Sequence, residues 1–212
     1  MILIGMFDSP FVRRVAVSMK LLDFTFEHYN WSVGKDFDRI LKHNPVGRVP
    51  TLLLDDGEAL PESAAILDYL DELAGPERAL LPRAGAARRQ ALRIMGLASG
   101  AAEKGVAEVF ERVFRPEAKR HEPWIERCRT QMQGALAALE RISQQRGIGN
   151  WLVSDRMTQA DVTLACIFTY LTDALALTAE RAPYPAVRAL SARCEALPEF
   201  QATRLAFAAP GG

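Results

Sequence analysis

The chain has 212 residues, of which 49% are hydrophobic and 25% are charged, a composition typical of a globular protein. Its formal net charge is +0, yet residues 1–77 hold 7 Lys and Arg against 13 Asp and Glu, and residues 78–212 hold 19 against 13. The extra basic residues are dispersed among glutamates, which argues against nucleic-acid binding. No apolar stretch reaches membrane-spanning length, so no membrane partner is expected.

The three cysteines form neither a CxxC pair nor a Cys/His cluster. We therefore expect no disulfide framework and no metal site. The N-terminus also lacks the basic flank of a signal peptide. A cytoplasmic protein is the default expectation.

The first 75 residues alternate between short strand patterns and helix patterns. A strand is predicted over 2–4, followed by a helix over 10–22 that Ser9 and Pro10 begin. Further elements follow in chain order: a strand over 24–31, a helix over 35–43, a strand over 51–54, a hairpin turn, a strand over 58–60 and a helix that Ser63 caps. The order β-α-β-α-β-β-α predicts an α/β domain.

Helical patterns alone follow Pro82. Helices are predicted over 86–114, 123–146, 158–178 and 184–197, the last stopped by Pro198. This half is predicted to be an all-α bundle. The expected domains are residues 1–77 and 86–205, and the alanine- and glycine-rich stretch after Leu205 is expected to be a loose terminus.

The segment from Asn44 to Leu52 contains Gly47 and Pro50 directly before a predicted strand. If the Val49–Pro50 bond is cis, Val49 presents its N–H and C=O outward, where an extended peptide can dock by strand-like hydrogen bonds. By itself the segment is more simply explained as a structural turn.

Glu62 and Ser63 open a predicted helix. A helix N-terminus with a serine hydroxyl suits an anion, and an adjacent carboxylate suits an ammonium group. Together they would match the free amino-acid end of a ligand. The alternative is an ordinary serine cap with an incidental acid beside it.

Taken together, these motifs resemble the cytosolic glutathione S-transferase family, in a bacterial, serine-type form. The resemblance rests on Ser9-Pro10-Phe11 after the first strand, Asn44-Pro45-x-Gly-x-Val49-Pro50, Glu62-Ser63, and Thr158-Gln159-Ala160-Asp161 in the second half. It covers nearly the whole chain and is strongest in the first 75 residues. It implies a thioredoxin-like N-terminal domain followed by an all-helical C-terminal domain.

The resemblance also implies a set of glutathione-binding residues. Val49, next to Pro50, would pair with the cysteinyl backbone, Ser63 would hold the γ-glutamyl carboxylate and Glu62 the γ-glutamyl amine. Phe11 belongs to the first of these motifs, and Arg48 would reach the glycyl carboxylate. The sequence does not choose between Lys35 and His43 as a further contact.

The catalytic residue implied by the resemblance is Ser9. Family members stabilise the glutathione thiolate with Tyr, Ser or Cys near the end of the first strand. Here Phe7 has no hydroxyl and no cysteine precedes Cys128, so Ser9 remains, with a plain helix cap as its alternative role. Lowering the pKa of a thiol by roughly two units takes about 2.7 kcal/mol, which one hydroxyl and a helix N-terminus can supply.

The expected activity is therefore glutathione transfer to a small hydrophobic electrophile, by conjugation or peroxide reduction, with glutathione as co-substrate. Two alternatives stay open: a non-catalytic binding or regulatory protein, and a glutathione-dependent isomerase, although no Ser-Ser/Cys doublet accompanies Ser9. The bundle side chains expected along the electrophile site are Phe110, Phe114, Trp124 and Tyr170. A homodimer is also expected, since family dimers join one chain's first domain to the other's bundle.

Overall fold

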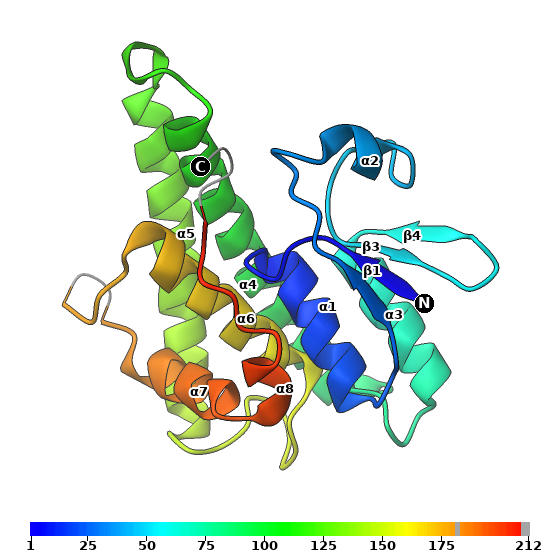
Figure 1. Cartoon of the computed structure of the whole chain (residues 1–212). Coiled ribbons are helices and arrows are strands. Elements are labelled where there is room, and N and C mark those ends of the chain that lie inside the picture. Colours follow the sequence, from blue (N-terminus) through cyan, green and yellow to red (C-terminus); the bar gives the residue numbers. More distant parts are fainter. Residues whose placement is uncertain (181–182, 209–212) are drawn as a thin grey trace.

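The computed structural model describes residues 1–180 and 183–208 of the chain, which form an α/β half beside a helical half. In Figure 1 the small sheet and α3 lie on one side, the long helices α4 and α5 lie on the other, and α1 runs between them. This arrangement confirms the predicted combination of a thioredoxin-like α/β unit with an all-α unit. None of the helices in the described chain is both long and apolar enough to span a membrane.

Four short strands form one mixed sheet in the order β2-β1-β3-β4. They are β1 (Ile2–Ile4), β2 (Glu27–Tyr29), β3 (Thr51–Leu53) and β4 (Ala59–Pro61). β1 runs parallel to β2 and antiparallel to β3, and β3 and β4 form the hairpin that the turn sequence predicts. β2 is shorter than the predicted 24–31, because the Phe24 N–H bonds to the Met19 carbonyl and closes the preceding helix instead of joining the sheet.

Three helices belong to this half: α1 (Pro10–Leu21), α2 (Phe37–Leu41) and α3 (Ser63–Ala74). α1 begins as predicted, with Ser9 as its N-cap and Pro10 in its first turn. It is buried along most of its length because β1 and α3 contact one side and α6 the other. The prediction that Ser63 caps α3 is wrong. The cap is Glu62, whose carboxylate accepts the N–H groups of Ser63 and Ala64.

The second half is helical, as predicted. It consists of α4 (Gly85–Val113), a 3₁₀ turn (Glu117–Lys119), α5 (Glu122–Arg146), α6 (Gln159–Leu175), α7 (Pro185–Glu195) and α8 (Pro198–Gln201). Pro198 lies three residues beyond the end of α7 and begins α8, so it starts a helix instead of stopping one. This placement suits proline, which is favoured in the first turn of a helix.

α6 is the central helix of the bundle, and a capping box fixes its start. The Asp161 carboxylate accepts the Thr158 N–H and hydroxyl at 2.8 Å each, and its other oxygen accepts the Leu152 N–H at 2.8 Å. Asp161 is fully buried, so these bonds satisfy polar groups that water cannot reach. The helix ends at Leu175, three residues before the predicted end, where Ala176 adopts a left-handed backbone.

The prediction of a loose tail after Leu205 is wrong for the residues that the structure describes. The Phe207 ring packs edge-on against Tyr170 of α6, with 5.7 Å between ring centroids. The Ala208 N–H donates to the Asp8 carboxylate at 3.2 Å. Residues 209–212 lie outside the described chain. The tail therefore returns from α8 across the start of α1, a long-range contact that its composition did not indicate.

Candidate active site

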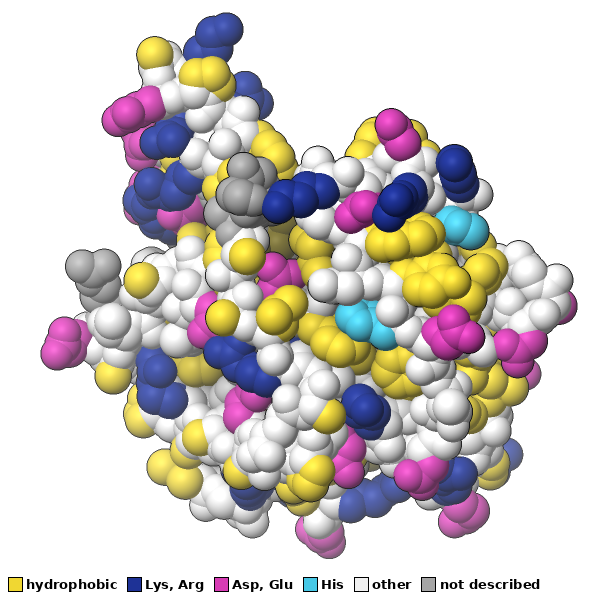
Figure 2. Space-filling view, viewed as in Figure 1, with side chains coloured by type: hydrophobic (Ala, Val, Ile, Leu, Met, Phe, Trp, Pro, Cys, Tyr) yellow, Lys and Arg dark blue, Asp and Glu magenta, His cyan; other side chains and the backbone are white. Residues whose placement is uncertain are grey.

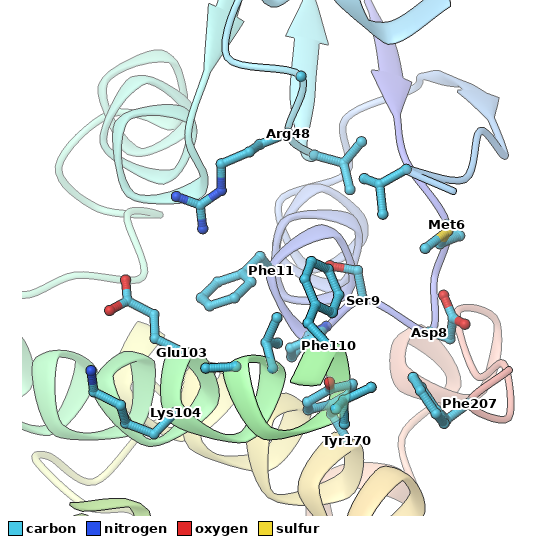
Figure 3. Close-up of a pocket in the computed structure, with 17 residues that line it drawn as sticks. Met6, Asp8, Ser9, Phe11, Arg48, Glu103, Lys104, Phe110, Tyr170 and Phe207 are labelled. Atoms are coloured by element: carbon cyan, nitrogen blue, oxygen red, sulfur yellow. The ribbon is translucent and has the colours of Figure 1, made fainter. Parts of the chain in front are cut away.

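A cleft of about 530 Å³ separates the α/β half from the middle of α4. The space-filling view shows a notch between the projecting tip of α4 and α5 and the part of the surface that carries α2 (Figure 2). The walls come from the start of α1, the loop before β3, α4, α6 and the C-terminal tail (Figure 3). Segments from both halves of the chain therefore build one site.

Ser9 lies in the wall of this cleft, at the N-terminus of α1. Its Oγ accepts a long 3.4 Å hydrogen bond from the Val12 N–H. Within the described chain the hydroxyl has no acceptor for its own proton. It is therefore able to donate to a ligand, with the positive end of the α1 dipole behind it.

Val49 lies in the loop opposite Ser9. The Val49–Pro50 bond is cis, as the docking hypothesis requires. Neither the N–H nor the C=O of Val49 forms a hydrogen bond with the residues that the structure describes. The Asn44 side-chain amide donates to the Arg48 carbonyl at 2.8 Å and to Thr51 Oγ1 at 3.2 Å. The loop is thus fixed from behind while the Val49 backbone remains available to a ligand.

The close approach of Gly5 to Val49 also fixes this loop. Gly5 has a φ of 131°, and a Cβ added there would lie 2.8 Å from the Val49 Cβ and 2.5 Å from Val12 Cγ2. Both distances are shorter than real Cβ contacts. Only glycine fits between the loop and α1, so residue 5 helps to set the width of the cleft at Val49.

Of the other predicted glutathione contacts, Phe11 and Arg48 line the cleft, and Pro50, Glu62 and Ser63 do not. Pro50 is buried behind Val49. Glu62 has a φ of 74°, which non-glycine residues rarely adopt, and its carboxylate bonds to the Ser63 N–H at 2.8 Å and the Ala64 N–H at 3.1 Å. The structure therefore gathers Ser9, Phe11, Arg48 and Val49, with Glu62 and Ser63 outside the lined volume.

Arg14 connects Ser63 to the cleft. The guanidinium packs 5.6 Å from the centre of the Phe11 ring and donates to Ser63 Oγ at 2.6 Å and to Ser99 Oγ at 2.9 Å. Burial lowers the pKa of Arg14, and the charge of Glu62 opposes that shift. A double arginine on a helix is typical of a solvated face, and only the burial of α1 on both sides reveals otherwise.

Aromatic side chains form part of the apolar wall of the cleft. Phe110 and Tyr170 line it, as expected, and Phe207 joins them from the tail. Phe114 and Trp124 are not in the lining. Phe114 packs edge-on against Phe110, at 5.0 Å between centroids, and Trp124 lies 5.9 Å from the Lys104 ammonium. The expectation of a wall drawn from the bundle helices therefore holds for two of its four residues.

Charged side chains stand at both ends of the cleft. Arg48 faces Glu103 and Lys104 of α4 across its opening (Figure 3). At the other end lies Asp8, which is 9% exposed. Neither Asp8 nor the α4 pair was expected, because an acid in a loop and a Glu-Lys pair on a helix are ordinary surface residues in a sequence.

The two remaining candidate glutathione contacts lie outside the cleft lining. The His43 ring lies 5.8 Å from the Trp31 ring, outside the cleft lining. Lys35 is also absent from that lining. No group of three or more His, Cys, Asp or Glu side chains in the described chain is arranged to hold a metal ion.

Family models and relatives match both halves of the chain. Residues 3–78 match the glutathione S-transferase N-terminal domain, and residues 122–193 match the glutathione S-transferase C-terminal domain. The Escherichia coli GST-like protein YibF is 30% identical, over 80% of this chain and 81% of its own. The maleylacetoacetate isomerase of Rattus norvegicus is 28% identical, over 89% of this chain and 83% of its own.

Solved structures share this fold over almost the full length of the chain. A glutathione S-transferase from Methylobacterium radiotolerans, in complex with glutathione sulfonate, has a TM-score of 0.89 and 32% identity, covering 98% of this chain and 95% of that one. One from Methylobacillus flagellatus, with glutathione bound, has a TM-score of 0.87 and 26% identity, covering 95% and 98%. The matches to both family models and to these relatives show that the chain belongs to the glutathione S-transferase family.

Proposed function

We propose that this protein is a glutathione transferase that binds glutathione in the cleft and activates its thiol for attack on a small hydrophobic electrophile. The observation that carries the proposal is the pairing of two unused hydrogen-bonding groups in one cleft: the Ser9 hydroxyl and the Val49 backbone. Relatives of the same fold bind glutathione or a glutathione analogue. In this proposal residues 1–77 form the glutathione-binding domain and residues 86–205 the helical domain.

Glutathione would lie along the loop before β3, with its cysteinyl backbone paired to Val49 next to the cis Pro50. Its γ-glutamyl end would reach Ser63 and Glu62 at the start of α3, where Arg14 supplies a buried positive charge behind the serine. Phe11 would pack against it, and Arg48 would meet the glycyl carboxylate. The charges of the ligand and of these side chains are complementary.

The sulfur would lie beside Ser9. A hydroxyl that donates to the thiolate, together with the N-terminus of α1, favours the charged form of the thiol. The electrophile would occupy the aromatic part of the cleft, between Phe110, Tyr170 and Phe207. Such a site suits a small apolar substrate whose reacting atom faces the sulfur.

Isothermal titration with glutathione tests the proposal directly. Saturable binding at a ratio of one glutathione per chain, weakened when Val49 is replaced by Pro, which removes the N–H, is the expected result. Binding with no turnover of any electrophile would favour the alternative of a non-catalytic binding or regulatory protein. No binding would overturn the proposed function.

A glutathione-dependent isomerase is the second candidate, and specific relatives favour it. The maleylacetoacetate isomerase of a rat, and proteins named "Probable maleylacetoacetate isomerase" in a nematode and a fly, are 27–28% identical to this chain over 88–90% of its length. An isomerase regenerates glutathione, whereas a conjugating enzyme consumes it. Measuring free thiol during turnover of a cis-alkene substrate separates the two.

A homodimer in the cytoplasm completes the proposal. The acidic balance of residues 1–77 and the basic balance of residues 78–212 suit pairing of one chain's first half with its partner's second half. Light scattering at micromolar concentration tests this, and a monomer would contradict it. All three cysteines are buried and unpaired, which accords with a reducing compartment.

A further inference from the structure

Asp8 is a buried acid in the wall of the cleft, next to Ser9 in the chain. Only 9% of its surface is exposed, and both residues line the cleft. In Figure 3 its carboxylate lies between Met6 and Phe207, at the end of the cleft away from Arg48. A carboxylate in such an apolar setting requires an explanation, because burying a charge without compensation is unfavourable.

The hydrogen bonds of Asp8 are incomplete. Oδ2 accepts the Ala208 N–H at 3.2 Å, and Oδ1 is buried without a partner in the described chain. Buried polar atoms are nearly always paired, so an unpaired one frequently has a function. A proton on the carboxyl group would remove the negative charge that is buried beside this unpaired oxygen.

Among the residues that the structure describes, no cation pairs with Asp8. It shares a small cavity of about 10 Å³ with Arg13, Arg204, Asp173 and Tyr170. Arg13 is held by Glu195 at 2.6 Å, and Arg204 by Asp173 at 2.7 Å, so both cations are committed elsewhere.

The remaining neighbours do not supply a charge either. Burial, reinforced by the charge of Asp8, raises the pKa of Tyr170, which stays neutral. Cys166, which borders the same cavity, is also neutral, since burial raises the pKa of its thiol to about 12. Asp8 is thus the unpaired carboxylate at this end of the cleft.

A glutathione thiolate beside Ser9 would put a second negative charge near this carboxylate. Like charges in a poorly solvated site do not both persist, and one of the two groups keeps a proton. Burial already raises the pKa of Asp8, while the backbone N–H groups of Ala208, Asp8 and Ser9 oppose that shift. The thiol and the carboxyl then share one negative charge, and the proton resides on whichever group is not ionised.

We propose that Asp8 accepts the proton of the glutathione thiol when the sulfur ionises and then delivers that proton to the electrophile. This role rests on the proposed function. The thiolate attacks the β-carbon of an alkene conjugated to a carbonyl, and a sulfur–carbon bond forms while the alkene π pair moves to give an enolate. The Asp8 carboxyl transfers its proton to the enolate. The resulting carboxylate is ready for the thiol proton of the next glutathione.

This chemistry selects a class of substrate. Addition to an alkene conjugated to a carbonyl needs a proton after the sulfur attacks, so a positioned acid speeds it. Substitution at an aryl halide releases a halide ion and needs no proton. Asp8 therefore assigns the cleft to electron-deficient alkenes in preference to aryl halides.

Two variants test this role. Asp8→Asn removes the titratable group but keeps an oxygen that can accept the Ala208 N–H. Asp155→Asn is the matched control, because it makes the same substitution at an exposed position outside the cleft lining. Circular dichroism and thermal melting establish that both variants fold.

The first measurement follows the proton without any electrophile. Glutathione is added in weak buffer at neutral pH, thiolate is measured by its ultraviolet absorbance, and proton release by a pH indicator. The wild type and Asp155→Asn should form thiolate with little proton release, whereas Asp8→Asn should release about one proton per thiolate. Equal release in all three proteins, or no thiolate in the wild type, would overturn the role of Asp8.

The second measurement compares an α,β-unsaturated ketone with 1-chloro-2,4-dinitrobenzene. Asp8→Asn should lose about 10²-fold in kcat/KM with the ketone and keep its rate with the aryl halide. Equal losses with both substrates, or no loss with the ketone, would refute the proton-transfer step. If the wild type does not bind glutathione, the proposed function fails as well, so the two failures are distinguishable.

Discussion

Arg14 and Ser63 are joined by a 2.6 Å hydrogen bond from the guanidinium to the hydroxyl, in the interior between α1 and α3. Ser63 Oγ in turn donates to the Glu62 carboxylate at 3.0 Å. Arg14 is 2% exposed and has no carboxylate within ion-pair distance in the described chain. A buried positive charge therefore stands directly behind the serine proposed to hold the γ-glutamyl carboxylate.

We predict that Arg14→Met weakens glutathione binding by roughly tenfold to a hundredfold, since a hydrogen bond to a charged group contributes about 1.5–3 kcal/mol. Isothermal titration measures the change. Arg93→Met is the matched control, because Arg93 is exposed on α4 and lies outside the cleft lining. A folded Arg14→Met protein with unchanged affinity would show that the cation does not assist the serine.

Replacing Ser9 tests the thiolate donor separately from the helix cap. Ser9→Ala should lower kcat by roughly 10²-fold, the typical loss for one charge-stabilising donor, and reduce stability by about 0.5–1 kcal/mol. Ser9→Gly should lose as much activity but only a few tenths of a kcal/mol, because glycine is tolerated at an N-cap. Steady-state kinetics and urea unfolding measure the two effects, and full activity in either variant would exclude the hydroxyl as donor.

Removing the Asp161 carboxylate should lower the stability of the helical half. Asp161→Ala leaves the Leu152 N–H and the two Thr158 donors buried without an acceptor, and we expect a loss of about 3 kcal/mol. Chemical denaturation followed by circular dichroism measures this. Asp155→Ala, at an exposed position in the preceding loop, should stay within about 0.5 kcal/mol of wild type. Similar losses in both variants would contradict the role given to the capping box.

Replacing either of two glycines of α4 by alanine should change the stability of the protein, in opposite directions at the two positions. A Cβ at Gly105 would lie 2.3 Å from Leu171 Cδ2, a fully buried atom of α6, so Gly105→Ala should lose about 1–3 kcal/mol. Gly96 has open space around it, so Gly96→Ala should gain about 0.5–1 kcal/mol from helix propensity alone. Thermal melting of both variants checks the pair. A stabilising Gly105→Ala would mean that α4 and α6 separate without cost.

Most of the fold was predictable from sequence because its signals are local. The caps of α1 and α6, the hairpin between β3 and β4 and the periodic helices of the second half each depend on residues close together in the chain. Ser9, Phe11, Arg48 and Val49, which line the cleft, could be predicted as candidates because they lie in short motifs next to these elements. At the start of α3, however, two adjacent residues could serve as the N-cap. The preference for serine as a cap predicted Ser63, whereas the cap is Glu62.

Only the tertiary structure decided which side chains share the cleft. Asp8 and Arg14 look like surface charges until α6, α3 and the tail bury them, and Phe207 looks like part of a loose end until it packs on Tyr170. Burial of a charge depends on what the rest of the chain places over it, and these contacts join residues up to 200 positions apart. The sequence by itself determined the family, most of the elements and the cap of α1, and tertiary packing determined which charged side chains are buried beside that cap.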